Sequence, residues 1–228
     1  MGQDREHSAI NRQALSIALA VAPFGLAFGV VSSEAGLSVV EAVGFSTLVF
    51  SGSAQFAAVS VLSDGGSAIA AVTAGLLLNL RSLAFGVAMA SALQGPLWWR
   101  ALVSQLMIDE STAVGSVQRT DTLKRYGYLT AGLAVFFFWN LSTLLGVSLL
   151  GSSEELIFHL GIDATIPAAF LALLWPRLHI REQREVALGG AIIALVLVPI
   201  TPVGVPIIAS AAAVCLARPW QAPEVPNP

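Results

Sequence analysis

The sequence has 228 residues, of which 56% are hydrophobic and only 11% are charged, and its formal net charge is −3. Its mean hydropathy is +0.79. A soluble domain carries about 25% charged residues, so this composition excludes a water-soluble globular fold and predicts an integral membrane protein. Leucine, valine and alanine occur in long runs without polar–apolar alternation, which favours membrane helices over a barrel of strands.

Charge and the rare residue types exclude further classes of protein. A net charge of −3 without a basic cluster offers no surface for nucleic acid or another polyanion. Cys215 is the only cysteine, so the chain can form neither an internal disulfide nor a cysteine-rich metal site. His159 and His179 lie in or near predicted loops without other metal-ligating residues beside them. We therefore expect no metal and no other cofactor.

The chain divides into a polar N-terminus (1–13), one membrane domain (14–217) and a Pro-rich tail (218–228) that is predicted to be disordered. Eight apolar segments lie within the membrane domain, at 14–31, 39–62, 68–93, 98–117, 128–150, 164–176, 186–200 and 203–217. A full span needs about 20 residues, so the last three segments are short, and prolines interrupt them. We predict an all-α, polytopic fold of seven or eight segments, in which these three include half-spans or broken helices.

Basic residues in the loops predict the orientation. They gather in four regions: Arg5 and Arg12; Arg119, Lys124 and Arg125; Arg177, Arg181 and Arg184; and Arg218. Eight crossings place all four regions on one side, and the positive-inside rule makes that side, with both termini, cytoplasmic. Six crossings would satisfy the charges equally well. Arg100 is the one discordant residue, and its neighbours Trp98 and Trp99 suggest an anchor at the membrane interface.

Three charged side chains lie deep inside apolar segments. Arg81 falls near the middle of segment 68–93, where an arginine costs roughly 2.5–3.5 kcal/mol on insertion scales. Asp109 and Glu110 are the acids deep in another segment, so an ion pair between Arg81 and one of them is the economical arrangement. Neighbours on a helix point about 100° apart, so the second acid would face a cavity. The alternative is an ion pair that only fixes helix packing, although buried pairs stabilise poorly.

Asn79 is the polar neighbour of Arg81 in the same segment. The two side chains differ by about 200° on a regular helix and point apart, unless the helix is unwound there. A helix broken at 79–82 would expose backbone amides and carbonyls to a substrate.

Other polar residues lie among small or apolar neighbours. Ser51, Ser53 and Gln55 form either a hydrogen-bonding wall for a zwitterion or a close helix contact with an interhelical hydrogen bond. Asn140 could hydrogen-bond another helix. Asp163 falls near the outer side, where acids are commonly solvated.

Two pairs of stretches suggest an internal duplication. PFGLAFGVVSSEAGL (23–37) and NLSTLLGVSLLGSSEEL (140–156) each place a Gly-Val pair before a serine-rich outer loop, and 53–62 loosely mirrors 165–174. Repeats are common in transporters, although apolar helices also resemble each other by composition alone.

Five motifs taken together resemble the AzlC/BrnF family. They are PFGLAFG (23–29), FSGSAQFAA (50–58), NLRSLAFG (79–86), the pair Asp109–Glu110 and GIDATIPAAFLALL (161–174). Ser82 stands where the family commonly has histidine, and Phe85 where it frequently has tyrosine. The resemblance implies the large subunit of a bacterial branched-chain amino acid exporter in the inner membrane. It also implies a small AzlD-like membrane subunit as partner, and leucine, isoleucine, valine and by extension methionine as substrates moved against the proton gradient.

The leading hypothesis is therefore a secondary transporter that exports branched-chain amino acids by proton antiport. Arg81 would hold the substrate carboxylate, and Asp109 or Glu110 would bind the ammonium group or the proton. Gln55 and Asn79 would supply neutral hydrogen bonds. A channel or structural subunit is the alternative, and it predicts no saturable, proton-dependent flux. An intramembrane enzyme is disfavoured, because the sequence contains neither Gly-x-Ser-x-Gly nor His-Glu-x-x-His.

Overall fold

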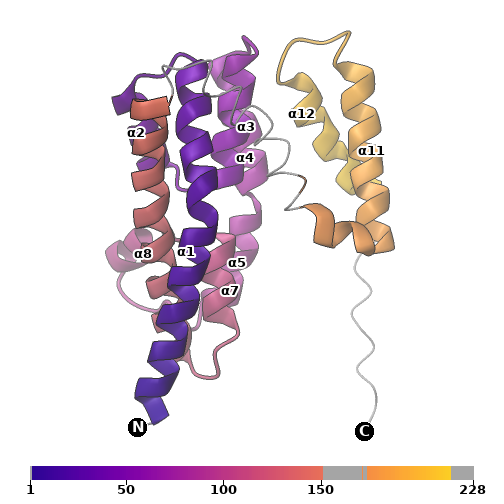
Figure 1. Ribbon diagram of the computed structural model, residues 1–228. Coiled ribbons are helices and arrows are strands. Elements are labelled where there is room, and N and C mark those ends of the chain that lie inside the picture. Colours follow the sequence, from indigo (N-terminus) through magenta and orange to yellow (C-terminus); the bar gives the residue numbers. More distant parts are fainter. Residues whose placement is uncertain (1, 151–170, 172–173, 217–228) are drawn as a thin grey trace, which may run out of the picture.

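The computed structural model describes residues 2–150, 171 and 174–216, and every element within these ranges is a helix (Figure 1). The predicted all-α membrane fold is confirmed for this part of the chain. Most of the predicted segment 164–176, the tail 218–228 and Asp163 lie outside the described residues.

Three helical stretches of the described chain are long and apolar enough to cross a membrane. A helix rises 1.5 Å per residue, so about 20 residues cross a hydrocarbon core of about 30 Å. The three stretches are α1 (Gly2–Glu34), the interrupted rod of α4 (Ala68–Asn79) and α5 (Arg81–Met89), and α8 (Asp121–Leu145) with its π-helical continuation η1 (Gly146–Leu150).

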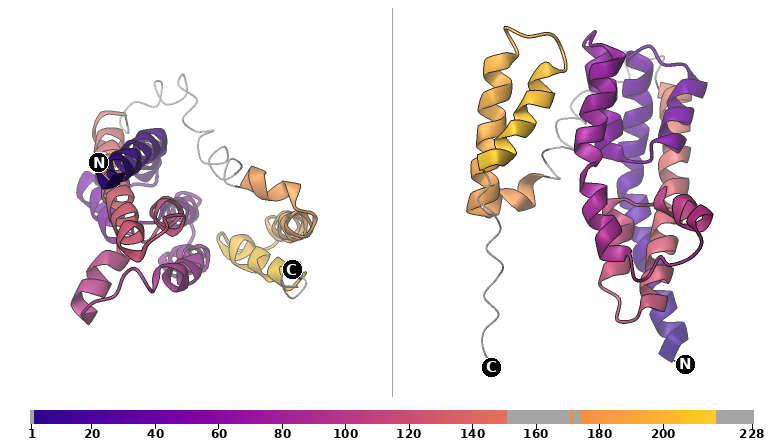
Figure 2. Two further views of the ribbon diagram at one scale, coloured as in Figure 1. Left: turned by 90° about the horizontal axis from the view of Figure 1, so that it is seen from below. Right: turned by 180° about the vertical axis from the view of Figure 1, so that it is seen from behind.

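Helices α1 and α8 lie side by side and run in the same direction (Figures 1 and 2). Near one end the Tyr126 hydroxyl donates to Asn11 Oδ1 at 2.7 Å, and near the other end Gly29 lies against Gly146. The two Gly-Val pairs of the suspected duplication thus face each other. Helix α1 already begins at Gly2, so residues 2–13 of the predicted polar N-terminus are helical and continuous with the first apolar segment.

The predicted segments 39–62 and 98–117 are not single spans, so this expectation was wrong. The first folds as α2 (Val39–Leu48) and α3 (Gly52–Ser63), and the second as α6 (Leu97–Ser104) and α7 (Asp109–Ser116). These helices are about 12–18 Å long, roughly half the depth of the hydrocarbon core. We infer that each pair is a re-entrant hairpin, hairpin 1 (39–63) and hairpin 2 (97–116), which turns at mid-depth and returns to its own side.

Local capping chemistry sets both turns. At the tip of hairpin 1, Ser51 takes extended dihedral angles (φ −156°, ψ 101°) and stands at the N-cap of α3. At the tip of hairpin 2, Ile108 is extended (φ −124°, ψ 170°), and its N–H donates to Ser111 Oγ at 3.2 Å. Asp109 and Glu110 then occupy the first turn of α7, where the helix dipole favours carboxylates.

The two hairpins enter from opposite ends of the bundle. Helix α2 runs back along the last part of α8, where Ser46 Oγ lies 3.3 Å from Thr143 Oγ1. Helix α6 begins beside the first part of α8, where the Arg125 guanidinium lies 4.8 Å above the Trp99 ring. The hairpin tips therefore approach each other near the middle of α8.

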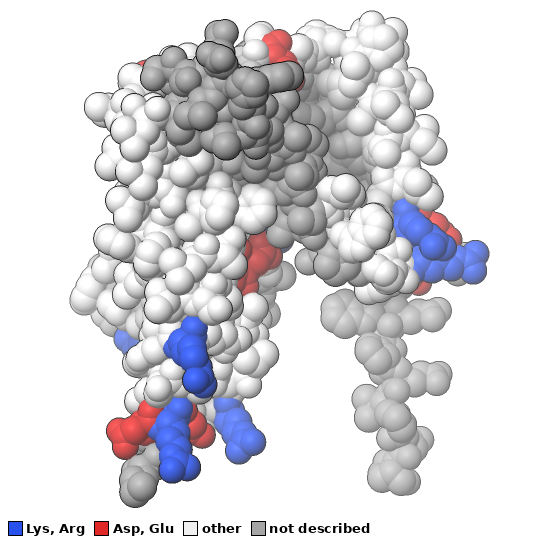
Figure 3. All heavy atoms as spheres, in the orientation of Figure 1, with Lys and Arg blue, Asp and Glu red and all other residues white. Residues whose placement is uncertain are grey.

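Because the two hairpins enter from opposite ends of the bundle, the position of Arg100 no longer conflicts with the positive-inside rule. Helix α6 begins at the same end as α1 and α8, so Arg100 joins the basic residues of that end, Arg5, Arg12, Arg119, Lys124 and Arg125. In Figure 3 the blue side chains of the bundle gather at its lower end. We call this the basic end, defined by residues 2–12, 90–100 and 117–125. It is the end that the positive-inside rule predicts to be cytoplasmic.

A C-terminal hairpin stands beside the bundle (Figure 1). It consists of η3 (Trp175–His179), α11 (Arg181–Leu197), α12 (Val205–Ser210) and η4 (Ala211–Leu216). It contacts α4 through Gly204, which has a left-handed φ of +89°, and a Cβ here would lie 2.9 Å from Ala70 Cβ. Glycine thus permits both the turn and the close contact. The predicted segments 186–200 and 203–217 correspond to α11 and to α12 with η4.

The re-entrant hairpins predict a labelling pattern. In a Cys215→Ala background, we expect Val40→Cys and Asp64→Cys to react from one face of the membrane, and Gln94→Cys and Arg119→Cys to react from the other. All four positions are exposed. A membrane-impermeant maleimide applied to right-side-out and inside-out vesicles measures this. Reaction of the cysteines at 40 and 64 from opposite faces would mean that this stretch spans the membrane.

The α1–α8 contact predicts a glycine requirement. A Cβ on Gly29 would overlap the carbonyl oxygen of Thr143, whereas a Cβ on Gly44 would meet nothing within 4 Å. We expect Gly29→Ala to lower the free energy of unfolding by about 1–3 kcal/mol, because the helices must separate. The matched control Gly44→Ala is expected to leave it unchanged. Thermal unfolding in detergent measures both, and equal melting temperatures would contradict the tight contact.

Candidate functional site

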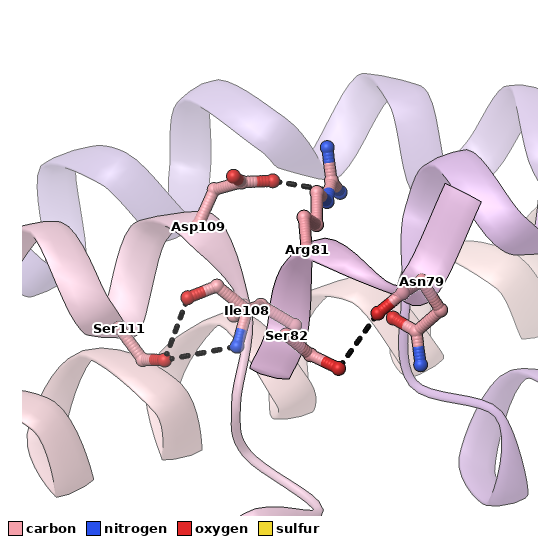
Figure 4. Close-up of polar contacts among 6 residues, drawn as sticks. All are labelled: Asn79, Arg81, Ser82, Ile108, Asp109 and Ser111. Carbon is pink, nitrogen blue, oxygen red and sulfur yellow. Dashed lines mark hydrogen bonds and ion pairs between the residues drawn. The ribbon is translucent and has the colours of Figure 1, made fainter. Parts of the chain in front are cut away.

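The centre of the bundle is built around the interruption between α4 and α5. Leu80 separates the two helices but keeps helical dihedral angles (φ −54°, ψ −27°), and Ser82 Oγ donates to the Asn79 carbonyl oxygen at 2.7 Å. The helix is therefore broken at Leu80, within the predicted stretch 79–82, but its dihedral angles stay helical and the Asn79 carbonyl is occupied by Ser82. Because the helical geometry persists, Asn79 and Arg81 point to different sides of the rod (Figure 4).

One side of the rod carries an ion pair. Arg81 Nη2 lies 2.7 Å from Asp109 Oδ2, so the predicted pairing with one of the two acids is formed, and the partner is Asp109 (Figure 4). The side chains are 35% and 33% exposed, so the described chain does not enclose the pair. Acidic side chains are visible at mid-height in Figure 3, in the hollow between the bundle and the C-terminal hairpin. Glu110 follows on α7, turned about 100° from Asp109.

The other side of the rod lines a pocket of about 630 Å³. Its wall combines one face of α4 and α5, the tip of hairpin 1 and the first half of hairpin 2. The polar residues of this wall are Ser51, Asn79, Ser82, Arg100, Ser104 and Gln105. Arg100 is its one charged residue, and no Asp or Glu belongs to the described lining. The pocket thus runs from mid-depth towards the basic end, and Arg81 is not part of its wall.

Two glutamine side chains hold the hairpin tips. Gln105 Nε2, from hairpin 2, donates to the carbonyl oxygens of Thr47 (2.8 Å) and Leu48 (3.0 Å). Gln55 Nε2, from α3, donates to the carbonyl oxygens of Ser46 (3.2 Å) and Val49 (2.6 Å). Four successive carbonyls at the end of α2 are thereby satisfied, which is what a helix end away from water requires.

Gln55 is therefore a structural residue of the tip and does not reach Arg81. Its side chain is fully buried, and its Oε1 accepts a hydrogen bond from Trp139 Nε1 at 2.9 Å. Both N–H donors and the acceptor are used within the fold, so the role predicted for Gln55 as a substrate contact gives way to the alternative, an interhelical hydrogen bond.

Of the remaining predicted site residues, one lines the pocket and the other described ones lie in contacts between helices. Ser51 is buried and lines the pocket, while Ser53 is buried outside the described lining. Asn140 joins α8 to α2, because its Oδ1 accepts a hydrogen bond from Thr47 Oγ1 at 3.3 Å. Asp163 lies outside the described residues.

Sequence reasoning missed four polar residues of the pocket wall: Ser82, Arg100, Ser104 and Gln105. Gln105 lies in the same apolar run as Asp109, and an amide in such a run is a signal as strong as the one that drew attention to Gln55. Arg100 was set aside as an interfacial anchor, although its conflict with the loop charges was the sign that segment 98–117 does not cross.

These features define a helical membrane protein in which the tips of two helical hairpins meet beside an interrupted helix at a polar pocket. Comparison with known proteins agrees that the chain is a membrane protein. The family model described as "AzlC protein" matches residues 16–152, and the chain belongs to the AzlC family.

Relatives extend the likeness over most of the chain. An uncharacterized membrane protein of Archaeoglobus fulgidus is 34% identical over 207 residues, which cover 90% of each chain. An uncharacterized membrane protein of Helicobacter pylori is 23% identical over 184 residues, which cover 80% of each chain. No solved structure matches the chain.

The bracing role of Gln55 predicts a large loss of stability. Gln55→Leu removes three buried hydrogen bonds and leaves polar atoms without partners in a dry site. We expect the free energy of unfolding to fall by about 2 kcal/mol or more. The same exchange at an exposed position, Gln94→Leu, is the control and should have little effect. Thermal unfolding in detergent, followed by tryptophan fluorescence, compares the two; similar values would remove Gln55 from this role.

Proposed function

We propose that this chain is the large subunit of a secondary transporter that exports leucine, isoleucine and valine across the bacterial inner membrane in exchange for protons. The observation that carries the proposal is the pocket of about 630 Å³ between the two hairpin tips. Its volume falls in the range of small-molecule sites, and transporters commonly place such sites at mid-depth where short helices end. We propose transport rather than catalysis as the activity of this site.

The pocket wall suits an aliphatic amino acid. Leu83, Val87 and Leu93 supply an apolar surface for a branched side chain, and hydroxyl and amide groups lie towards the hairpin tips. The pocket extends towards the basic end, which is the predicted cytoplasmic face. An exporter must load from that face, so the direction of the pocket supports export.

The ion pair on the other side of the rod is proposed to serve the protons. Ionisable groups within a membrane domain are costly and mark ion or proton pathways. Arg81 and Asp109 are each about one third exposed at the surface of the chain, and Glu110 adds a second carboxylate at the next position. Proton binding by these carboxylates would alternate with pairing to Arg81.

A small AzlD-like membrane subunit is proposed as the partner. The side chains of Leu48, Leu83 and Val87 are 77%, 69% and 80% exposed, although all three line the pocket. A pocket that holds a polar main chain needs a cover on this flank, because lipid cannot satisfy the substrate's charges. An apolar subunit against these residues would close it.

The test is efflux of leucine from cells preloaded with a leucine-containing dipeptide, with and without the chain and its small subunit. Arg81→Ala and Glu110→Gln should abolish efflux while the protein remains in the membrane. Arg119→Ala, an exposed cation at the basic end, is the matched control and should transport normally. Normal transport by both site variants would refute the roles given to these residues. Efflux that neither saturates nor responds to a protonophore would indicate a channel instead.

A further inference from the structure

The tip of hairpin 1 brings the opposite poles of two short helices together. Helix α2 ends at Leu48 and α3 begins at Gly52, so a carbonyl end and an amide end are separated by three residues. Helix ends carry about half an elementary charge, negative at the carbonyl end and positive at the amide end, and at mid-depth there is little water to screen them. Leu48, Val49, Phe50 and Ser51 all belong to the wall of the pocket.

The amide end of α3 carries hydroxyl groups without partners. Ser51, at the N-cap, is only 4% exposed and lines the pocket, yet it makes no side-chain hydrogen bond to the amides of α3. Ser53, in the first turn, is 7% exposed, and its hydroxyl has no partner among the described residues. The first N–H groups of a helix also lack intrahelical acceptors. Buried donors of this kind are normally satisfied. Ser51 belongs to the pocket wall, so an anionic group in the pocket would satisfy its hydroxyl, whereas Ser53 lies outside the described lining.

The carbonyl end of α2 is already occupied by a donor. Gln105 Nε2 donates to the carbonyl oxygens of Thr47 at 2.8 Å and Leu48 at 3.0 Å. Its NH₂ group offers two N–H donors from one nitrogen, and an ammonium group offers three with a positive charge. Leu48 belongs to the described lining of the pocket and Thr47 lies directly before it, and no acid belongs to that lining, so the carbonyl end of α2 is where the pocket offers acceptors to a cation.

We propose that the hairpin tip binds the main chain of an α-amino acid. The carboxylate accepts hydrogen bonds from Ser51 and from the first-turn amides of α3. The ammonium group donates to the carbonyl oxygens of Thr47 and Leu48 and displaces the amide of Gln105. This inference rests on the proposed function, and it moves the carboxylate away from Arg81, which faces the other side of the rod.

Three ligands test the carboxylate-binding and the ammonium-binding parts of this site independently. L-Leucine carries both charges, 4-methylpentanoate carries only the carboxylate, and 3-methylbutylamine carries only the ammonium group. Binding is measured by calorimetry in detergent micelles, on the full chain together with the proposed small subunit. Ser51→Ala should weaken the binding of leucine and of 4-methylpentanoate by about tenfold, because a hydrogen bond to the charged carboxylate is lost. The binding of 3-methylbutylamine should not change.

Two further variants complete the experiment. Gln105→Met removes the competing donor, so leucine and 3-methylbutylamine should bind more tightly while 4-methylpentanoate does not change. Ser104→Ala is the matched control, because Ser104 lines the same pocket but its hydroxyl donates to the Ala101 carbonyl oxygen. All three ligands should bind this variant as they bind the unaltered protein. Melting temperatures verify that each variant is folded.

The outcomes distinguish the main-chain site from the proposed function. If Ser51→Ala weakens the binding of all three ligands equally, or of none, the main-chain site is overturned. Binding of leucine by the unaltered protein would still support the proposed function. If the unaltered protein binds 4-methylpentanoate but not leucine, the carboxylate half stands and the substrate assignment fails. If it binds none of the three, both fail.

Discussion

A helix that ends in the middle of a bilayer leaves carbonyl groups that lipid cannot hydrogen-bond, and the centre of this protein is organised around that constraint. The last carbonyls of α2, from Ser46 to Val49, are satisfied by two glutamine amides from different elements. Gln55 reaches them from within hairpin 1, and Gln105 reaches them from hairpin 2. A donor must reach each of these carbonyls at mid-depth; the buried Gln55 amide supplies it permanently for Ser46 and Val49, and the Gln105 amide supplies it for Thr47 and Leu48.

The two glutamines have different surroundings, and this difference separates structure from function. Gln55 is fully buried and tied to Trp139, so its hydrogen bonds belong permanently to the fold. Gln105 lines the pocket, so the carbonyls it holds are within reach of a ligand. Arg81 and Asp109 lie on the other side of the α4–α5 rod. Polar chemistry at the centre is thus divided into a pocket and an ion pair, with one interrupted helix as the wall between them.

The sequence predicts the class of fold and the central ion pair, because both follow from strong free-energy terms. Low charge content requires a membrane, and an arginine deep in an apolar segment requires an anion, which Asp109 supplies. The re-entrant hairpins were missed because segments 39–62 and 98–117 are long enough to span. Two local signals were present: Ser51 before Gly52, and Asp109–Glu110 with Ser111, both typical of helix starts.

The composition of the pocket could not be derived from the sequence, because it depends on which residues meet across two hairpins. Gln105 and Thr47 are separated by 58 residues, and no periodicity within either segment connects them. Gln55 illustrates the opposite case. It is a polar residue in an apolar run, but whether it faces a ligand or a backbone carbonyl is decided by packing around Trp139.

Helix α1 has 33 residues and is therefore about 50 Å long, well beyond the hydrocarbon thickness. Its excess length projects from the basic end as a rigid stalk, steadied by the contact of Asn11 and His7 with Tyr126. Because α1 continues through Pro23 to Gly29 as one helix, the projecting end and the close contact with α8 belong to the same element.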